Sequence, residues 1–288
     1  MCVGYTVLLT LLFARPLVDL AVSAAGSKLD SYILLVPLVS GYLLYIQRRS
    51  LPGALRSSVL GTLVVGGVGV AALAAAVLAS GSVSVHDSLA LIALAYVAFI
   101  GAGGFFFLGA RWMAAAAFPA AFLIFMVPLP DGAVDWLEKA SVVASAEAAA
   151  LFFSIAGTSL VRHGTEFELP GIVLRVGQEC SGIRSSWVLF ITSLLASHLF
   201  LRNPWRRLVL VSFVIPLGIL RNGFRILVIG LLCVHIGPQM IDSPIHHRGG
   251  PIFFALSLVP LLALAWWLRH GEFPPYTSPG LKPRPTQE

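Results

Sequence analysis

Charge of either sign is scarce in this chain of 288 residues. Lys, Arg, Asp and Glu make up 11% of it, whereas hydrophobic residues make up 58%. An average soluble domain carries about 25% charged residues. This chain has too few charges to cover a surface that faces water, so the composition excludes an ordinary soluble protein and predicts an integral membrane protein.

Acidic residues are fewer than basic ones, 13 against 19, and the net charge is +6. In a soluble protein, such an excess favours binding to nucleic acid. Here the basic residues cluster at the ends of apolar segments, where they determine how membrane helices are oriented. We therefore expect contact with a membrane and none with nucleic acid.

Cysteine is scarce as well. Cys2, Cys180 and Cys233 are too few and too widely spaced for a disulfide framework. Patterns typical of metal sites are also missing, because neither H-x-x-x-H nor H-E-x-x-H occurs. A site built from His235, His246, His247 and Asp242 is the remaining metal hypothesis. We expect no metal and no other cofactor.

Long apolar segments are abundant, and several reach the roughly 20 residues that a helix needs to cross hydrocarbon. The fold class that this predicts is an all-α polytopic membrane protein with about eight transmembrane helices. One membrane domain covers residues 1–270, and a Pro-rich, disordered cytoplasmic tail covers residues 271–288. The predicted spans are about 4–25, 31–47, 57–80, 88–109, 112–128, 185–201, 207–236 and 251–268.

Short basic segments predict the orientation of these spans. Residues 47–56 and 202–207, together with Arg111 and Arg269, fall on one side, which the positive-inside rule makes cytoplasmic. Most acidic residues then fall on the other side. We expect a multi-pass protein of the cytoplasmic membrane whose outer face carries the candidate residues described below.

The region between the fifth and sixth spans differs from a membrane helix. Residues from about 129 to 157 have a helical pattern but carry Asp135, Glu138, Lys139 and Glu147. This predicts an interfacial or re-entrant amphipathic helix on the outer face. The following segment, HGTEFELPGIVLRVGQEC, alternates as strands do around a Pro-Gly turn. We expect a short outer-face hairpin that leads directly into Cys180.

Cys180 lies where the sixth span begins. Backbone N–H groups at a helix N-terminus lower the pKa of a thiol, and Arg184 adds positive charge within one turn. Ser181 offers a hydroxyl and Gly182 permits close approach of the backbone, whereas Glu179 precedes the thiol. Cys180 is therefore either a reactive thiol or a small packing residue. We interpret Cys233, inside an apolar run, as a packing residue.

Two arginines lie within the seventh span, in PLGILRNGFRILV. Arg221 and Arg225 are four residues apart and share a helix face, with Asn222 beside them. Charged residues inside a span are costly and mark functional sites. The alternative is an arginine that extends to the lipid headgroups.

A histidine pair precedes the eighth span. His246 and His247 lie in DSPIHHRGGPIFF, and a histidine there is suited to proton transfer because its pKa is near neutral. The alternative is a solvated loop histidine. The predicted orientation brings the thiol, the arginines and the histidines to one membrane face, and these are the groups that thioester acyl transfer requires.

The motifs ECSGIRS, NGFRI and IHHRGGPIFF, in this order, resemble those of the exosortases and archaeosortases over about residues 30–268. That family comprises polytopic membrane cysteine transpeptidases. The resemblance implies that Cys180, Arg225 and His246 are catalytic. Arg221 remains a second candidate arginine, and His247 a second candidate histidine, because the family has His-Asp at that pair.

The resemblance also implies the substrates. They would be secreted proteins with a C-terminal tripartite sorting signal, cleaved on the outer face and transferred to a lipid or surface amine. A processing protease that uses water as the acceptor is the close alternative. A transporter that binds an anion at the arginines is the alternative from another class.

Overall fold

The computed structural model describes residues 1–27, 29–53, 56–79, 81–177, 182–242 and 249–272. The chain forms two compact units, Met1–Leu137 and Glu138–Glu288. In the described part, six helices are long and apolar enough to cross a membrane, or up to eight if each of two bent helix pairs is one span. The predicted all-α polytopic fold class is therefore confirmed.

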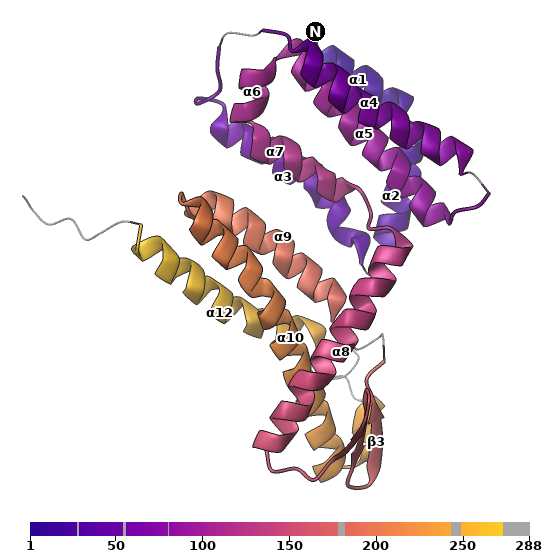
Figure 1. Cartoon of the computed structure of the whole chain (residues 1–288), viewed down its shortest axis with the longest axis vertical. Coiled ribbons are helices and arrows are strands. Elements are labelled where there is room, and N and C mark those ends of the chain that lie inside the picture. The colour runs from indigo at the N-terminus through magenta and orange to yellow at the C-terminus, as the bar shows by residue number, and fades with distance from the viewer. Residues whose placement is uncertain (28, 54–55, 80, 178–181, 243–248, 273–288) are drawn as a thin grey trace, which may run out of the picture. The chain divides into compact units, whose positions relative to one another are not determined.

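The first unit consists of helices alone among its described residues (Figure 1). Its longest pair, α4 and α5, packs closely through small residues, which let two helix backbones approach each other in a membrane. Gly66, for example, faces Ala102. The elements are α1 (Cys2–Leu12), α2 (Ala14–Gly26), η1 (Asp30–Leu35), α3 (Val36–Gln47), α4 (Val59–Leu78), α5 (Val85–Phe107), α6 (Ala110–Ala115), α7 (Ala117–Phe122) and η2 (Leu123–Met126).

Two predicted spans of this unit are not single helices. The span expected at 4–25 bends by 69° between α1 and α2, and the one expected at 112–128 is divided into α6, α7 and η2. In each of these two spans, the first helix ends four residues before a proline. Helix α1 ends before Pro16, and α6 ends before Pro119. Proline cannot donate to the carbonyl four residues earlier, and its ring clashes with that carbonyl.

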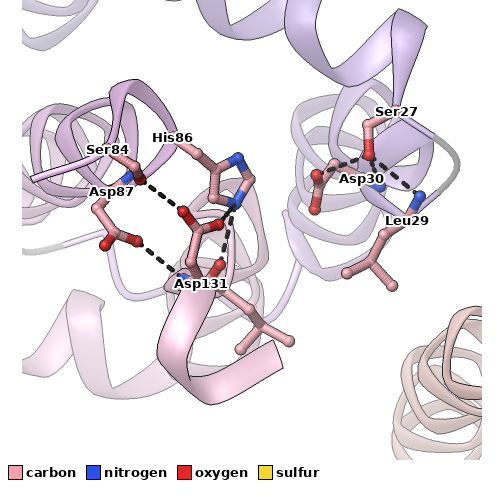
Figure 2. A network of polar contacts seen from close by, with 8 residues as sticks. Ser27, Leu29, Asp30, Ser84, His86, Asp87 and Asp131 are labelled. Atoms are coloured by element: carbon pink, nitrogen blue, oxygen red, sulfur yellow. Dashed lines mark hydrogen bonds and ion pairs between the residues drawn. The ribbon is translucent and has the colours of Figure 1, made fainter. Parts of the chain in front are cut away.

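Polar side chains join the start of α5 to the start of α8 (Asp131–Ile155), as Figure 2 shows. Ser84 caps α5 by accepting from the N–H of Asp87 at 3.0 Å, and its hydroxyl donates to Asp131 at 2.6 Å. The Asp87 carboxylate in turn accepts from the N–H of Asp131 at 2.8 Å. His86 Nε2 lies 3.0 Å from the Leu129 carbonyl. Each helix start therefore receives a carboxylate or hydroxyl from the other segment.

The second unit combines most of α8 with a bundle of α9 (Ile183–Phe200), α10 (Pro204–His235) and α12 (Gly250–His270). The 3-10 helix η4 (Pro238–Asp242) follows α10. In Figure 1, α9, α10 and α12 lie side by side. Their shared core includes Leu189, Leu201, Leu210, Val214, Leu217 and Leu261. The predicted helix after residue 129 is α8.

A three-stranded antiparallel sheet packs against α8 and the second half of α10. Its strands are β1 (Val161–His163), β2 (Glu166–Leu169) and β3 (Ile172–Arg175). The turn between β2 and β3 is Pro170-Gly171, where Gly171 has a φ of +82°. Proline followed by glycine with positive φ is typical of a type II turn. The predicted hairpin is confirmed, whereas β1 was not expected.

Glu272 closes the end of the bundle where α9 stops and α10 begins. Its carboxylate accepts from the backbone N–H groups of Arg202 and Asn203, both at 2.8 Å. These hydrogen bonds, with the nearby charges of Arg206 and Arg207, lower the pKa of Glu272. Arg206 also donates to two carbonyls at the end of α12. Charged and backbone groups thus tie the end of α12 to the α9–α10 connection.

Candidate functional site

The candidate site is built around the turn that starts α9. Gly182 precedes this helix and has the left-handed conformation, with φ +66° and ψ 8°. A Cβ at this position would lie 2.8 Å from Asn222 Oδ1 and 3.2 Å from Arg221 Nη2. Both the backbone conformation and the lack of space therefore require glycine.

Arg221 projects from α10 to this turn. Its Nη2 donates to the Gly182 carbonyl and to Ser186 Oγ, both at 3.0 Å. The same carbonyl accepts from the N–H of Ser186 and the hydroxyl of Ser185, also at 3.0 Å. Three donors on one carbonyl fix the first turn of α9 against α10.

The guanidinium of Arg221 is buried, with 7% of the residue exposed. Its Nη1 is inaccessible and has no hydrogen-bond partner within the described residues. A buried charged donor without an acceptor is costly. An acceptor such as a carbonyl or a carboxylate oxygen would offset this cost.

Close helix packing places the polar residues of α10. On α10, Gly218 faces Ser186 Oγ of α9, and a Cβ at Gly223 would meet Ala148 of α8 at 2.6 Å. Asn222, between these two glycines, is 2% exposed. The glycines let α9 and α8 approach the stretch of α10 that carries Arg221 and Asn222.

An ion pair joins the sheet to α8, the helix that packs against this stretch of α10. Arg162 on β1 donates to both carboxylate oxygens of Glu147 on α8, at 2.8 and 2.7 Å. Such bidentate pairs restrict geometry more than single hydrogen bonds do. Behind this pair, Phe153, Phe167 and Ile226 share one apolar core. The sheet, α8 and α10 therefore form one packed body within this unit.

The structure describes five of the residues predicted from sequence. It brings Gly182, Arg221 and Asn222 into contact. Arg225 lies one turn further along α10 and is partly buried, whereas Arg184 is exposed in the first turn of α9. The remaining predicted residues lie outside the described residues: Glu179, Cys180, Ser181, His246 and His247.

Sequence reasoning missed Ser185 and Ser186. The Ser185 hydroxyl donates to the Gly182 carbonyl, and Ser186 Oγ accepts from Arg221 of α10. The signal was their position, since residues three and four after a helix cap lie beside it. Among the described residues, no group of three His, Cys, Asp or Glu side chains has the arrangement of a metal site.

Comparison with known proteins gives one match. None of the curated proteins and none of the solved structures compared with the chain matches it. The family model described as transmembrane exosortase (Exosortase_EpsH) matches residues 24–263. This range contains the α9 turn and the buried arginine, together with all three sequence motifs. The chain therefore belongs to the transmembrane exosortase family.

Proposed function

We propose that this protein is a membrane cysteine transpeptidase that cleaves the C-terminal sorting signal of secreted proteins and transfers the new C-terminus to an amine. The observation that carries the proposal is the buried Arg221 at the turn that starts α9. Cys180 comes two residues before Gly182 in the sequence. A cationic donor is thus held at the helix start that follows the candidate nucleophile, in a chain of the exosortase family.

In the proposed first step, the Cys180 thiolate attacks the carbonyl carbon of the scissile peptide bond. The tetrahedral intermediate collapses as the C–N bond breaks and a thioester forms. His246 donates a proton to the leaving amine, because an imidazole titrates near neutral pH whereas arginine does not. In the second step, an acceptor amine attacks the thioester carbonyl carbon and gives a proton to the now neutral His246. An amide bond forms as the C–S bond breaks, which releases the Cys180 thiolate.

We assign different roles to the two arginines. The Asn-x-x-Arg pattern, with Asn222, favours Arg225 as the donor that stabilises the oxyanion, a contribution of about 10²–10³ in rate for one such donor. Arg221 is a positioning residue, because its Nη2 holds the Gly182 carbonyl and Ser186. Its Nη1 is buried and has no hydrogen-bond partner within the described residues.

The substrate class follows from the family resemblance. We propose secreted proteins with a tripartite C-terminal signal, which combines a short motif, a membrane span and a basic tail. Cleavage would occur at the outer face of the cytoplasmic membrane, and the acceptor would be an amine of a lipid or a surface component. The fate of the new C-terminus separates this activity from that of a protease that uses water.

The test compares substrate processing by the wild type, Cys180→Ala and Cys233→Ala. Cys233 is a buried free thiol and serves as the matched control. Cells would express each variant with a protein that carries a candidate C-terminal signal, and processing would be followed by blotting. We expect only Cys180→Ala to block cleavage. Mass spectrometry of the product's C-terminus then distinguishes an amide from a free carboxylate, and processing without Cys180 would refute the mechanism.

A further inference from the structure

Strand β3, at one edge of the sheet, has backbone groups that point away from the sheet. The N–H of Val176 donates to the carbonyl of Thr165, the residue just before β2, at 3.0 Å. In an antiparallel pair, residues alternate between bonding the partner strand and pointing away. Residues Ile172 and Leu174 therefore bond β2, whereas Val173 and Arg175 each direct one N–H and one C=O outward.

This edge has no neighbouring strand within the described part of the chain. The sheet order is β1-β2-β3, so β3 is an edge strand. Val173 is 60% exposed, and the side chain of Arg175 is exposed while it pairs with Glu166 at 3.4 Å. An edge strand with outward N–H and C=O groups is a template for the addition of an extended peptide.

The opposite edge is a poorer template. Strand β1 has three residues, and by the same alternation only Arg162 directs its backbone groups outward. The Arg162 side chain is bonded to Glu147 and to the Gly164 carbonyl. β3 thus offers two outward residues, against one on β1.

The direction of β3 indicates how a peptide would run along it. The strand runs from Ile172 to Arg175, and the chain continues through Gly177 to Gly182 and the first residue of α9, a helix that can span the membrane. A substrate cleaved at this turn has its soluble part before the cut and its membrane span after it. The part before the cut must therefore approach the turn in the same direction as β3.

We propose that β3 binds the extended segment of the substrate that immediately precedes the cleaved bond, as a parallel fourth strand of the sheet. This inference rests on the proposed function. Backbone hydrogen bonds from Val173 and Arg175 hold the peptide whatever its side chains are. The β3 edge thus binds peptides independently of their sequence, and selectivity for side chains comes from elsewhere in the site.

Cross-linking tests this assignment without relying on activity. A benzoylphenylalanine is introduced at Val173 or at Val161 of a Cys180→Ala protein, so that bound substrate stays uncleaved. The two positions are well matched, because both pair with Glu168 in one row across the sheet and are 60% and 54% exposed. We expect at least a fivefold higher yield from position 173, with adducts in the residues just before the cleavage site.

Equal yields from the two edges, a lack of adducts from position 173, or adducts after the cleavage site would each overturn the proposal. A second measurement uses the enzyme with Cys180 intact. Val173→Pro removes one outward N–H, and edge strands tolerate proline there, whereas Val173→Ala keeps it. We expect Val173→Pro to raise KM about fivefold with little change in kcat, as the loss of one hydrogen bond implies, and Val173→Ala to leave KM near the wild-type value.

An unchanged KM for Val173→Pro would also count against the parallel strand. Failure of the proposed function has a different signature, because the wild type would then leave the substrate uncleaved whichever position cross-links.

Discussion

Replacing Gly182 with alanine tests whether the turn before α9 has the geometry described. The alanine would have to keep the left-handed backbone conformation of this position, which costs an L-residue about 1–2 kcal/mol. Its Cβ would also lie 2.8 Å from Asn222 Oδ1, and overpacking of this kind costs about 1–3 kcal/mol. The two effects together predict a loss of about 2–5 kcal/mol of stability.

Three other glycines separate these two contributions. Gly171 has a φ of +82° with no atom near the position of a Cβ, so Gly171→Ala has only the conformational cost. Gly223 has an ordinary helical conformation but faces Ala148, so Gly223→Ala has only the packing cost. Gly41 has neither constraint, and Gly41→Ala should stabilise α3 by up to about 1 kcal/mol.

The assay is thermal unfolding of the purified protein in detergent, with substrate processing measured in parallel. We expect the midpoint to fall in the order Gly41→Ala, wild type, Gly171→Ala and Gly182→Ala. Processing should be lost in Gly182→Ala, because Gly182 follows the candidate nucleophile Cys180 by two residues in the sequence. If Gly182→Ala and Gly171→Ala lose equal stability, the contact with Asn222 does not limit this turn.

Three further predictions concern charge and capping. Arg221→Lys cannot bond two acceptors in the same plane and should lower processing about 10²-fold, the cost of a 1 Å misplacement, whereas exposed Arg49→Lys should not. Because folding lowers the pKa of Glu272, its carboxylate stabilises the folded protein at pH values above the unfolded-state pKa of about 4.3. This stabilisation is lost as the pH falls through the lower folded-state pKa. The unfolding midpoints of the wild type and Glu272→Gln should therefore converge on acidification from pH 7 to pH 3, and a constant difference would refute this. Ser84→Ala should destabilise the protein by about 1 kcal/mol, more than Ser58→Ala, whose cap hydrogen bond is 3.4 Å long.

Much of the membrane fold follows from the sequence because apolar length alone predicts spans. Hydropathy does not register where a helix must stop, so the breaks near Pro16 and Pro119 were missed although each proline was visible. Strand β1 was missed because three residues with the sequence VRH have no detectable alternation. Its place in the sheet depends on pairing with β2 and on the ion pair with Glu147.

The candidate site was predicted only in part. The pattern C-S-G indicated close backbone approach at Gly182, and the contact with Asn222 agrees with it. The spacing of Arg221 and Arg225 placed both on one face but could not tell which would be more buried. That difference depends on how α9 packs against α10, which no pattern within one helix records.

The length of α10 fixes how far its arginines lie from the start of the helix. Its 32 residues extend about 48 Å at 1.5 Å per residue, whereas the hydrocarbon core is about 30 Å thick. Counted from Trp205, an exposed aromatic of the kind that marks a membrane interface, about 20 residues reach Arg225. The arginines are thus a fixed number of residues from this interface marker, and the turns of α10 beyond them pack against the sheet. If the substrate has the membrane span that we propose, a span one helical turn longer or shorter would move its cleavage point about 5.4 Å relative to the arginines.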